Sequence, residues 1–441
     1  MHLVSRGSST RVPASPTLGR RGFVQLLGAA GAVSLAGCAG PGSDDPGRQS
    51  TAASLDADAS GDVIFSHWRA EDQSVFDELL ARFAETYPDV ELTQDIAPSA
   101  DYQASALQRL RNGDSGDAFS TFRGAQFNAF AEAGVYSDLG DLDLVGSYPD
   151  ELATIGQSDG KQLAVPYQVV FLDPVVNLDL LEKAGVSEIP TDWDGYLAML
   201  DALRGTGAVP FGWPGGDTGN LGQLVNTMVM NNAPAEDMFT QVGAGELKLT
   251  DDWFVTTLRQ YAELAPYMQE GVRGTLHDSL LQQFAQGEVA IIASGSYAIA
   301  PSRAAGAEFP MDLAPPVTVA AGEARYVGVH NATFLLGVNA ASENQEAAVA
   351  WVDFLSQPEN AAVYANSTAQ HVGVEGVTYE NADLKRLERW LTADTLLAPR
   401  FQLLDLDVQA AVDQSTVAVV GGTSPEQAAE EAQAIVDQQI G

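Results

Sequence analysis

Residues 63–93 read VIFSHWRAEDQSVFDELLARFAETYPDVELT, and their pattern decides the fold class. Val63 to Phe65 form a short apolar strand, and apolar residues then recur at helical spacing at Val75, Phe76, Leu79, Leu80 and Phe83. Ser74 and Asp77 predict a capping-box start for this helix. Tyr87-Pro88 ends it, and Val90 to Thr93 predict a second strand. A strand, a helix and a strand in succession favour a parallel α/β arrangement.

The same alternation returns further along the chain. Asp192 predicts the N-cap of a helix, and Pro358 is expected to limit a helix that runs through Leu355. Further strands are predicted at residues 209–211, 290–293 and 333–338, and a last helix is predicted from Ser424-Pro425. No internal repeat is visible. We therefore expect one continuous α/β construction from residue 62 onward.

The N-terminal segment has the order of a secretory signal. Arg20-Arg21 precedes an apolar run of about 15 residues, shorter than the roughly 20 that a transmembrane helix needs. The run ends in Leu35-Ala36-Gly37-Cys38, and Cys38 is the only cysteine. We expect residues 1–37 to be a twin-arginine lipoprotein signal and Cys38 to carry lipid. Residues 38–61, rich in small and polar residues, are expected to be a flexible spacer that tethers the protein to the outer face of the cell membrane.

The composition limits the ligands and the chemistry. The chain has 22 Lys+Arg and 59 Asp+Glu, and the signal holds four of the arginines and no acid, so the mature charge is 18 − 59 = −41. Such a surface repels nucleic acid and polyanionic ligands, although a salty habitat also favours acidic proteins. A single cysteine and scattered histidines predict neither a disulfide nor a metal site. Motifs of serine hydrolases, zinc proteases and nucleotide-binding loops are absent from the sequence.

Four stretches in this order resemble the extracellular solute-binding proteins of ABC importers, in the maltose-binding-like cluster that takes up oligosaccharides. They are residues 159–167 (DGKQLAVPY), residues 177–193 with their Asn, Leu-Leu, Ala-Gly and Pro-Thr-Asp-Trp, residues 284–297 ending in Gly295-Ser296-Tyr297, and residues 338–355. The resemblance runs from about Val63 to Leu403. It implies a two-lobed, type II periplasmic-binding-protein-like α/β fold, each lobe a mostly parallel sheet flanked by helices, with the ligand in the cleft between them.

The resemblance also implies boundaries and partners. Lobe 1 is expected at residues 62–167 and 317–357, and lobe 2 at residues 168–316 and 358–441. The ligand is expected to be a neutral sugar or oligosaccharide, delivered to the permease subunits of an ABC transporter. We expect a monomer without catalytic residues, cofactor or metal.

Sugar sites combine aromatic platforms with planar polar groups that bind hydroxyls. Trp68, Glu71 and Asp72 follow the first strand, at the end where ligands of α/β sheets usually bind, although both acids also suit the start of the next helix. Phe122, Arg123 and Gln126 follow another predicted strand. The other candidates are Tyr167 and Gln168 near the hinge, Trp213 and Asp217 in a Gly- and Pro-rich loop, Tyr297, and His330 with Asn331. Trp193, Trp351 and Trp390 lie on amphipathic patterns and are expected in the core.

Two alternatives stay open from the sequence. A secreted glycoside-active enzyme needs only two carboxylates at a suitable separation, and acids are abundant in this chain. A scaffold lipoprotein with the same fold and no ligand would lack convergent polar groups in its cleft.

Overall fold

The computed structural model describes residues 52–55, 58–112 and 116–440. The expected signal segment, the lipidation site at Cys38 and the first part of the spacer lie outside these residues. The end of the expected spacer differs from the prediction, because the backbone N–H of Ala53 donates to the carbonyl of Asp138 at 2.8 Å. Ala53 and Ala59 are both buried, since their small side chains fit against the folded chain. The spacer prediction is therefore wrong for its last residues.

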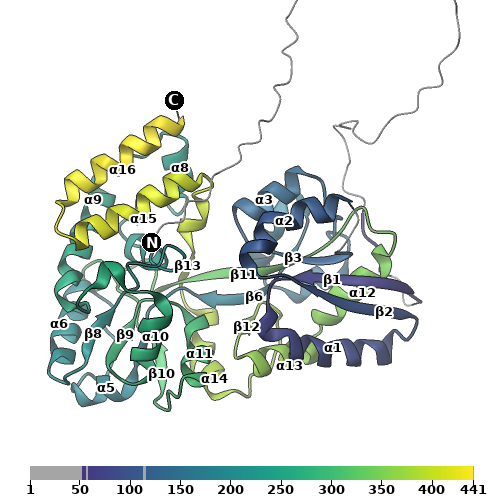
Figure 1. The fold of residues 1–441 in the computed structure, drawn as a ribbon, viewed down its shortest axis with the longest axis horizontal. Helices are drawn as coiled ribbons and strands as arrows, with labels where there is room; N and C mark the ends of the chain where they lie inside the picture. Colours follow the sequence, from purple (N-terminus) through teal and green to yellow (C-terminus); the bar gives the residue numbers. More distant parts are fainter. Residues whose placement is uncertain (1–51, 56–57, 113–115, 441) are drawn as a thin grey trace, which may run out of the picture. The chain divides into compact units, whose positions relative to one another are not determined.

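The larger of the two main sheets is mixed and has seven strands (Figure 1). Its order is β12-β6-β11-β3-β1-β2, with β13 paired to β11. The bounds are β1 (Gly61–His67), β2 (Val90–Ile96), β3 (Ala118–Thr121), β6 (Val165–Phe171), β11 (Gly328–Val338), β12 (His371–Val372) and β13 (Thr395–Leu397). Strand β1 is parallel to β2 and β3, as the opening stretch of sequence predicts.

A second, four-stranded sheet has the order β10-β7-β9-β8. Its strands are β7 (Val175–Asn177), β8 (Val209–Gly212), β9 (Val289–Ile292) and β10 (Met311–Leu313). Only β8 and β9 are parallel in it. Both sheets are thus mixed rather than mostly parallel, because the chain re-enters each of them through antiparallel strands. A small hairpin joins β4 (Gln157–Ser158) to β5 (Lys161–Gln162).

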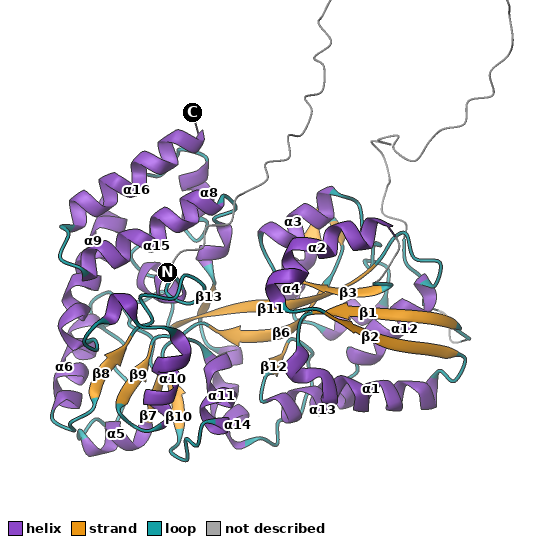
Figure 2. Ribbon diagram, viewed as in Figure 1, coloured by secondary structure: helices purple, strands orange, loops and turns teal. Residues whose placement is uncertain are grey.

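Helices cover both sheets (Figure 2). Those of lobe 1, which we define by its shared core, are α1 (Gln73–Thr86), α2 (Ser99–Asn112), α3 (Ala125–Glu132), α4 (Asp150–Ala153), α12 (Gln345–Leu355) and α13 (Pro358–Thr368). Those of lobe 2 are α5 (Leu178–Lys183), α6 (Trp193–Arg204), α7 (Gln223–Val229), α8 (Met238–Gly243), α9 (Asp252–Leu264), α10 (His277–Ala285), α11 (Ile299–Ala304), α15 (Leu406–Val420) and α16 (Pro425–Ile440). Helix α14 (Ala382–Leu387) adds side chains to the cores of both lobes.

The long strands β6 and β11 connect the two lobes. Tyr167 of β6 packs in the core of lobe 1, whereas Val170, three residues later, packs in that of lobe 2. Strand β11 makes the same crossing in the opposite direction, from Val329 to Leu335. The first crossing therefore lies between Tyr167 and Val170. The chain returns to lobe 1 later than residue 317, where the sequence-based division expects it, because Val317 still packs in the core of lobe 2.

Helix α13 belongs to lobe 1, whereas the sequence-based division assigns residues from 358 to lobe 2. Pro358 does end one helix pattern, but it also occupies the first turn of the next helix. Ala361, Tyr364 and Ala365 of that helix are buried in the core of lobe 1. Apolar contact with α1 therefore keeps the chain in the first lobe beyond the expected boundary.

The start of α1 also differs from the prediction. The helix begins at Gln73, so Ser74 lies inside its first turn and forms no capping box. Asp72 holds the N-cap position without capping, since its carboxylate binds Arg69 and Tyr364 instead. The predicted cap at Asp192 is confirmed, as its Oδ1 accepts the N–H of Gly195 at 2.9 Å. Trp193, Trp351 and Trp390 are buried, as expected.

Candidate functional site: a cleft between the lobes

A cavity of about 610 Å³ lies between the lobes, over the crossing strands β6 and β11. This volume is in the range of sites that hold small ligands. Six of the thirteen candidate residues line it: Trp68, Glu71, Asp72, Phe122, Gln168 and Tyr297. They come from the β1–α1 loop, the β3–α3 loop, β6 and the segment after β9. The structure thus brings together candidates that are far apart in the sequence.

Two of the aromatic candidates stack on each other. The ring centroids of Trp68 and Phe122 are 3.8 Å apart, and the ring planes differ by 20°. Trp68 also packs against Tyr102 and Phe334, and only 9% of its surface is exposed. Phe122 is more exposed, so it offers an apolar ring face to the cleft while Trp68 supports it from behind.

Tyr297 lies on the lobe 2 side of the cleft, at the start of α11. Its hydroxyl donates to Oδ1 of Asn220 at 3.1 Å. Loss of hydration raises the pKa of Tyr297 to about 12, so the hydroxyl stays protonated at neutral pH. Beside it, Ala300, Pro301 and Ala304 of α11 complete a mostly apolar wall.

Asp72 is not a free acceptor for ligand hydroxyls. Arg69 forms an ion pair with its carboxylate through Nε and Nη2, and the hydroxyl of Tyr364 donates to Oδ2 at 2.7 Å. The carboxylate is nearly buried, whereas Glu71 is 62% exposed and lies 3.4 Å from Arg69. In this structure the carboxylate of Asp72 is therefore bound by Arg69 and Tyr364, while Glu71 and Arg69 also line the cleft.

Neighbouring residues of β6 point to opposite sides. Gln168 lines the cleft, and its Oε1 accepts the hydroxyl of Thr333 at 2.8 Å. Tyr167 is fully buried in the core of lobe 1, with its ring 5.1 Å from that of Tyr364. Successive side chains of a strand alternate between faces, so only one of the pair can reach the cleft. In this structure Tyr167 therefore lies outside the cleft.

Arg123, Gln126, His330 and Asn331 lie where the lobes touch and do not line the cavity. Nη1 of Arg123 donates to Oδ1 of Asn331 at 3.2 Å and to the carbonyl of Ala398 at 3.0 Å. Burial lowers the pKa of Arg123 to about 10, yet the side chain remains a cation at neutral pH. Gln126 accepts the N–H of Phe122 at 2.8 Å, and Nδ1 of His330 lies 2.9 Å from Oγ1 of Thr395. In this structure Arg123 thus links Asn331 of the crossing strand β11 to the backbone of Ala398, and the other two side chains bind groups of the protein.

Trp213 and Asp217 also serve the fold of lobe 2. Trp213 is fully buried, and its Nε1 donates to the carbonyl of Leu221 at 3.0 Å. Trp213 lies in a loop, as predicted, but its ring packs in the core of lobe 2 and does not line the cleft. Asp217 accepts the N–H groups of Gly219, Asn220 and His277, so its carboxylate fixes this loop.

Several cleft residues were missed by sequence reasoning. They are Arg69, Ser74, Val75, Val170, Ala300, Pro301, Ala304, Thr333, Ser367, Thr368 and Gln370. Arg69 follows the predicted site residue Trp68 directly in the sequence, so it could have been predicted as a cleft residue too. Residues 367–370 had none, because their place in the cleft depends on α13 packing in lobe 1.

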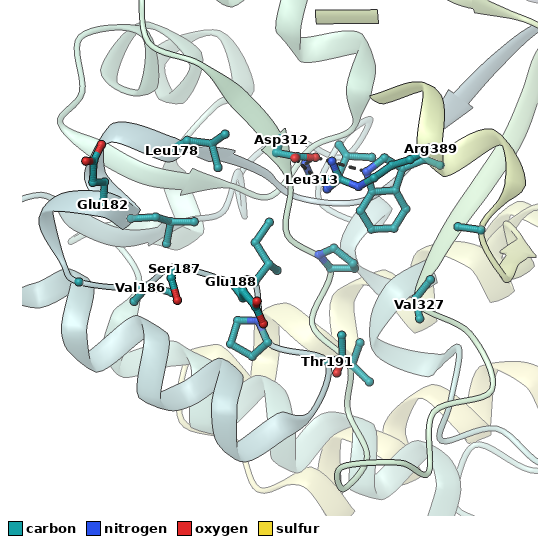
Figure 3. Close-up of a pocket in the computed structure, with 18 residues that line it drawn as sticks. Leu178, Glu182, Val186, Ser187, Glu188, Thr191, Asp312, Leu313, Val327 and Arg389 are labelled. Carbon is teal, nitrogen blue, oxygen red and sulfur yellow. Dashed lines mark hydrogen bonds and ion pairs between the residues drawn. The ribbon is translucent and has the colours of Figure 1, made fainter. Parts of the chain in front are cut away.

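A second cavity, of about 820 Å³, lies in lobe 2 outside the cleft (Figure 3). Its lining is mostly apolar and includes Leu178, Val186 and Leu313. At one end Arg389 forms an ion pair with Asp312 at 2.7 Å, and Figure 3 shows these side chains facing each other. An apolar lining of this kind does not suit a ligand covered with hydroxyls.

Within residues 52–55, 58–112 and 116–440, no group of three or more His, Cys, Asp or Glu side chains is arranged to hold a metal ion. Nor does any helix in that part of the chain have the length and apolarity needed to cross a bilayer. The cleft is therefore the site that the geometry supports, because aromatic, aliphatic and polar side chains from both lobes line it.

Comparison with solved structures supports the two-lobed fold. The chain is similar to the ligand-free structure of RafE from Streptococcus pneumoniae, with a TM-score of 0.74, 18% identity, and coverage of 87% of this chain and 99% of that one. A structure titled as a chitin oligosaccharide binding protein matches with a TM-score of 0.71 at 20% identity, over 86% of this chain and 99% of the other.

Sequence comparison identifies one curated relative and a family. The diacetylchitobiose binding protein DasA of Streptomyces coelicolor is 28% identical over 202 residues, which are 44% of this chain and 46% of the relative. The match thus spans about half the length of that relative. The family model described as bacterial extracellular solute-binding protein matches residues 68–362, well over half of the chain. The chain belongs to the bacterial extracellular solute-binding proteins.

Proposed function

We propose that this protein captures a neutral sugar or oligosaccharide between its lobes and delivers it to the permease of an ABC importer. The observation that carries the proposal is that the cleft offers both apolar faces and neutral polar groups. Phe122 of lobe 1 and Tyr297 with α11 of lobe 2 supply apolar faces, and Gln168, Thr333 and other neutral polar groups supply hydrogen-bond partners. A sugar ring has an apolar C–H face and an edge of hydroxyls, so it can bind both kinds of group at once.

The similar proteins bind ligands of this class according to their titles. One structure of RafE contains raffinose, a sugar transporter protein from Bacillus licheniformis was solved with stachyose, and DasA is named for diacetylchitobiose. All three ligands are uncharged oligosaccharides. The net charge of −37 disfavours anionic ligands, and a neutral sugar is compatible with it.

Capture is proposed to occur by hinge closure. The lobes are joined by β6 and β11, and a ligand that contacts both walls stabilises the arrangement in which the walls are close. The permease would then recognise the closed form. No covalent chemistry is proposed, because only two acids, Glu71 and Asp72, line the described cleft, and Asp72 is already bound by Arg69 and Tyr364.

A thermal-shift screen of the purified protein tests this proposal. The ligands are raffinose, stachyose, diacetylchitobiose and maltotriose, with amino acids, polyamines and metal ions as controls. A ligand at 100 times its dissociation constant adds about 2.7 kcal/mol of stability. We expect a clear rise in Tm with at least one sugar and no product after long incubation. No response to any sugar would favour the scaffold alternative, and cleaved sugar would favour the enzyme.

The lipid anchor is a separate part of the proposal. We propose that Cys38 carries lipid and holds the protein on the outer face of the membrane. When expressed in a host that processes lipoproteins, the wild-type chain should partition into the detergent phase and Cys38→Ser should not. Equal partitioning of the two chains would contradict the anchor and leave the sugar site unaffected.

A further inference from the structure

The segment between α13 and β12 brings three polar residues to the cleft. Helix α13 ends at Thr368, and Ala369 follows in the left-handed conformation, with φ 54° and ψ 40°. Alanine rarely adopts this conformation, which costs of the order of 1 kcal/mol or more. Ser367, Thr368 and Gln370, which flank Ala369, all line the cavity. The strained residue therefore lies where the chain turns into the cleft.

Gln370 has the features of a side chain that awaits a ligand. It is only 6% exposed and lines the cavity. Its backbone N–H donates to the carbonyl of Ala365, but its side-chain amide makes no hydrogen bond with any residue in the described part of the chain. Among the described residues, the amide of Gln370 is not one of the fully buried side-chain groups without a partner, so it is open to the cleft, where a ligand can bind it.

The strand register explains why Gln370 points into the cleft. His371 pairs with Val169 in the β12–β6 ladder, which places Gln370 next to Val170, another residue that lines the cavity. His371 faces the opposite side, where its Nε2 lies 3.1 Å from the carbonyl of Leu384. This alternation is the one that separates Gln168 from Tyr167.

The same segment is held rigidly against the first lobe. The hydroxyl of Thr368 donates to the carbonyl of Tyr364 at 2.8 Å, and the hydroxyl of Tyr364 donates to Asp72. Asp72 in turn binds Arg69, which also lines the cavity. Two cleft-lining segments that are far apart in the sequence are thus coupled through one tyrosine, so the position of Gln370 is defined before a ligand arrives.

From this geometry we infer that Gln370 is a specificity-determining residue that binds two adjacent hydroxyls of one sugar unit. An amide offers an oxygen acceptor beside two N–H donors, and a vicinal diol offers a donor beside an acceptor in the complementary order. Sugars that lack one of the two hydroxyls would leave part of the amide unpaired, and a polar site rejects such analogues strongly. The inference rests on the proposed function.

The test measures Kd by isothermal titration calorimetry for wild type, Gln370→Ala and Gln370→Glu, with Gln427→Ala on α16 as the remote control. The probes are raffinose, stachyose and diacetylchitobiose, followed by monodeoxy analogues of whichever sugar binds most tightly. We expect Gln370→Ala to weaken the parent sugar about tenfold or more. Removal of either of two neighbouring hydroxyls from the sugar should weaken its binding to wild type. The same removal should have little further effect on binding to Gln370→Ala. The Tm of the ligand-free variant should stay close to that of wild type.

An unchanged Kd in Gln370→Ala would overturn the inference. So would an equal loss for the parent sugar and every deoxy analogue, or a loss accompanied by a large drop in the ligand-free Tm, since both would mean a structural role. If wild type binds none of the sugars, the proposed function fails and the inference fails with it. If wild type binds a sugar and Gln370→Ala behaves like wild type in all of these measurements, the inference fails and the proposed function is not affected.

Discussion

The hydroxyl of Tyr364, on helix α13, donates a hydrogen bond of 2.7 Å to Oδ2 of Asp72, at the start of helix α1. The acceptor is also the partner of Arg69, so one carboxylate neutralises a nearly buried cation and orders a tyrosine. A single polar contact thus joins the first and the last of the lobe 1 segments that line the cleft. Loss of this carboxylate should affect stability and not only binding.

The first prediction concerns Asp72→Asn. The change removes the closer of the two carboxylates beside the largely buried Arg69 and leaves only the exposed Glu71, and breaking a buried pair in this way typically costs about 3–5 kcal/mol. The free energy of unfolding in urea should fall by about that amount. Glu71→Gln is the matched control, because Glu71 is exposed and its contact with Arg69 is at the surface, so it should change stability by less than about 1 kcal/mol. Similar effects of the two changes would show that Asp72 is not the structural partner.

The second prediction separates the two stacked rings. Trp68 is covered by Phe122, Tyr102 and Phe334, so Trp68→Ala should cost about 3–5 kcal/mol of folding free energy. Phe122 presents a face to the cleft, so Phe122→Ala should mainly weaken sugar binding, by about tenfold or more. Urea unfolding and calorimetric titration measure the two effects. A larger binding loss in a stably folded Trp68→Ala than in Phe122→Ala would reverse this assignment.

The third prediction concerns pH. Burial lowers the pKa of His67, His330 and His371 to about 4, from about 6.5 in an unfolded chain. Between these values the unfolded state binds protons that the folded state does not. The stability that these residues contribute is therefore complete above about pH 6.5 and is lost as the pH falls toward 4, at about 1.4 kcal/mol per pH unit for each histidine.

Urea unfolding at several pH values between 4.5 and 7.5 measures this slope. His371→Asn removes one of the histidines whose pKa burial lowers, so its unfolding free energy should depend less steeply on pH, by about one proton. An identical slope in variant and wild type would mean that His371 remains accessible to protons in the folded state.

The fold could be predicted from the sequence because the patterns that indicate its strands and helices are local. The strand, helix and strand of residues 63–93 form β1, α1 and β2 as predicted, and Phe122 and Tyr297 follow strands that end at the cleft. The failures have a different origin. All seven residues of β6 are buried, so no alternation in the sequence tells Tyr167 from Gln168. Trp213 looks like a loop residue by its neighbours, yet distant segments cover it.

Gln370 could not be found from the sequence for the same reason. Its place depends on α13 packing against α1 and on β12 pairing with β6, and both contacts join parts of the chain that are remote in sequence. Neither the composition of residues 367–370 nor their spacing carries a sign of this. Residues that bind through such long-range contacts become visible only when the tertiary fold is known.

The last prediction concerns Asp173, which follows β6 where the chain enters lobe 2. It is fully buried, and both of its oxygens accept the backbone N–H of Val329, at 3.0 and 3.1 Å. Burial without a cation raises the pKa of Asp173 well above its usual range. The folded state therefore keeps a proton that the unfolded chain releases above about pH 4, and this residue costs more stability as the pH rises.

The Asp173→Asn variant removes this cost, since the amide is neutral at every pH. Its stability relative to wild type should rise with pH, by up to about 1.4 kcal/mol per unit, which is opposite in sign to the effect of the histidines. The buried amide group adds a penalty that does not depend on pH, so the slope and not the absolute value is the test. Urea unfolding of both proteins from pH 5 to pH 8 measures the difference. Parallel curves would show that the wild-type carboxyl is ionised in the folded state, with its charge stabilised by the N–H of Val329.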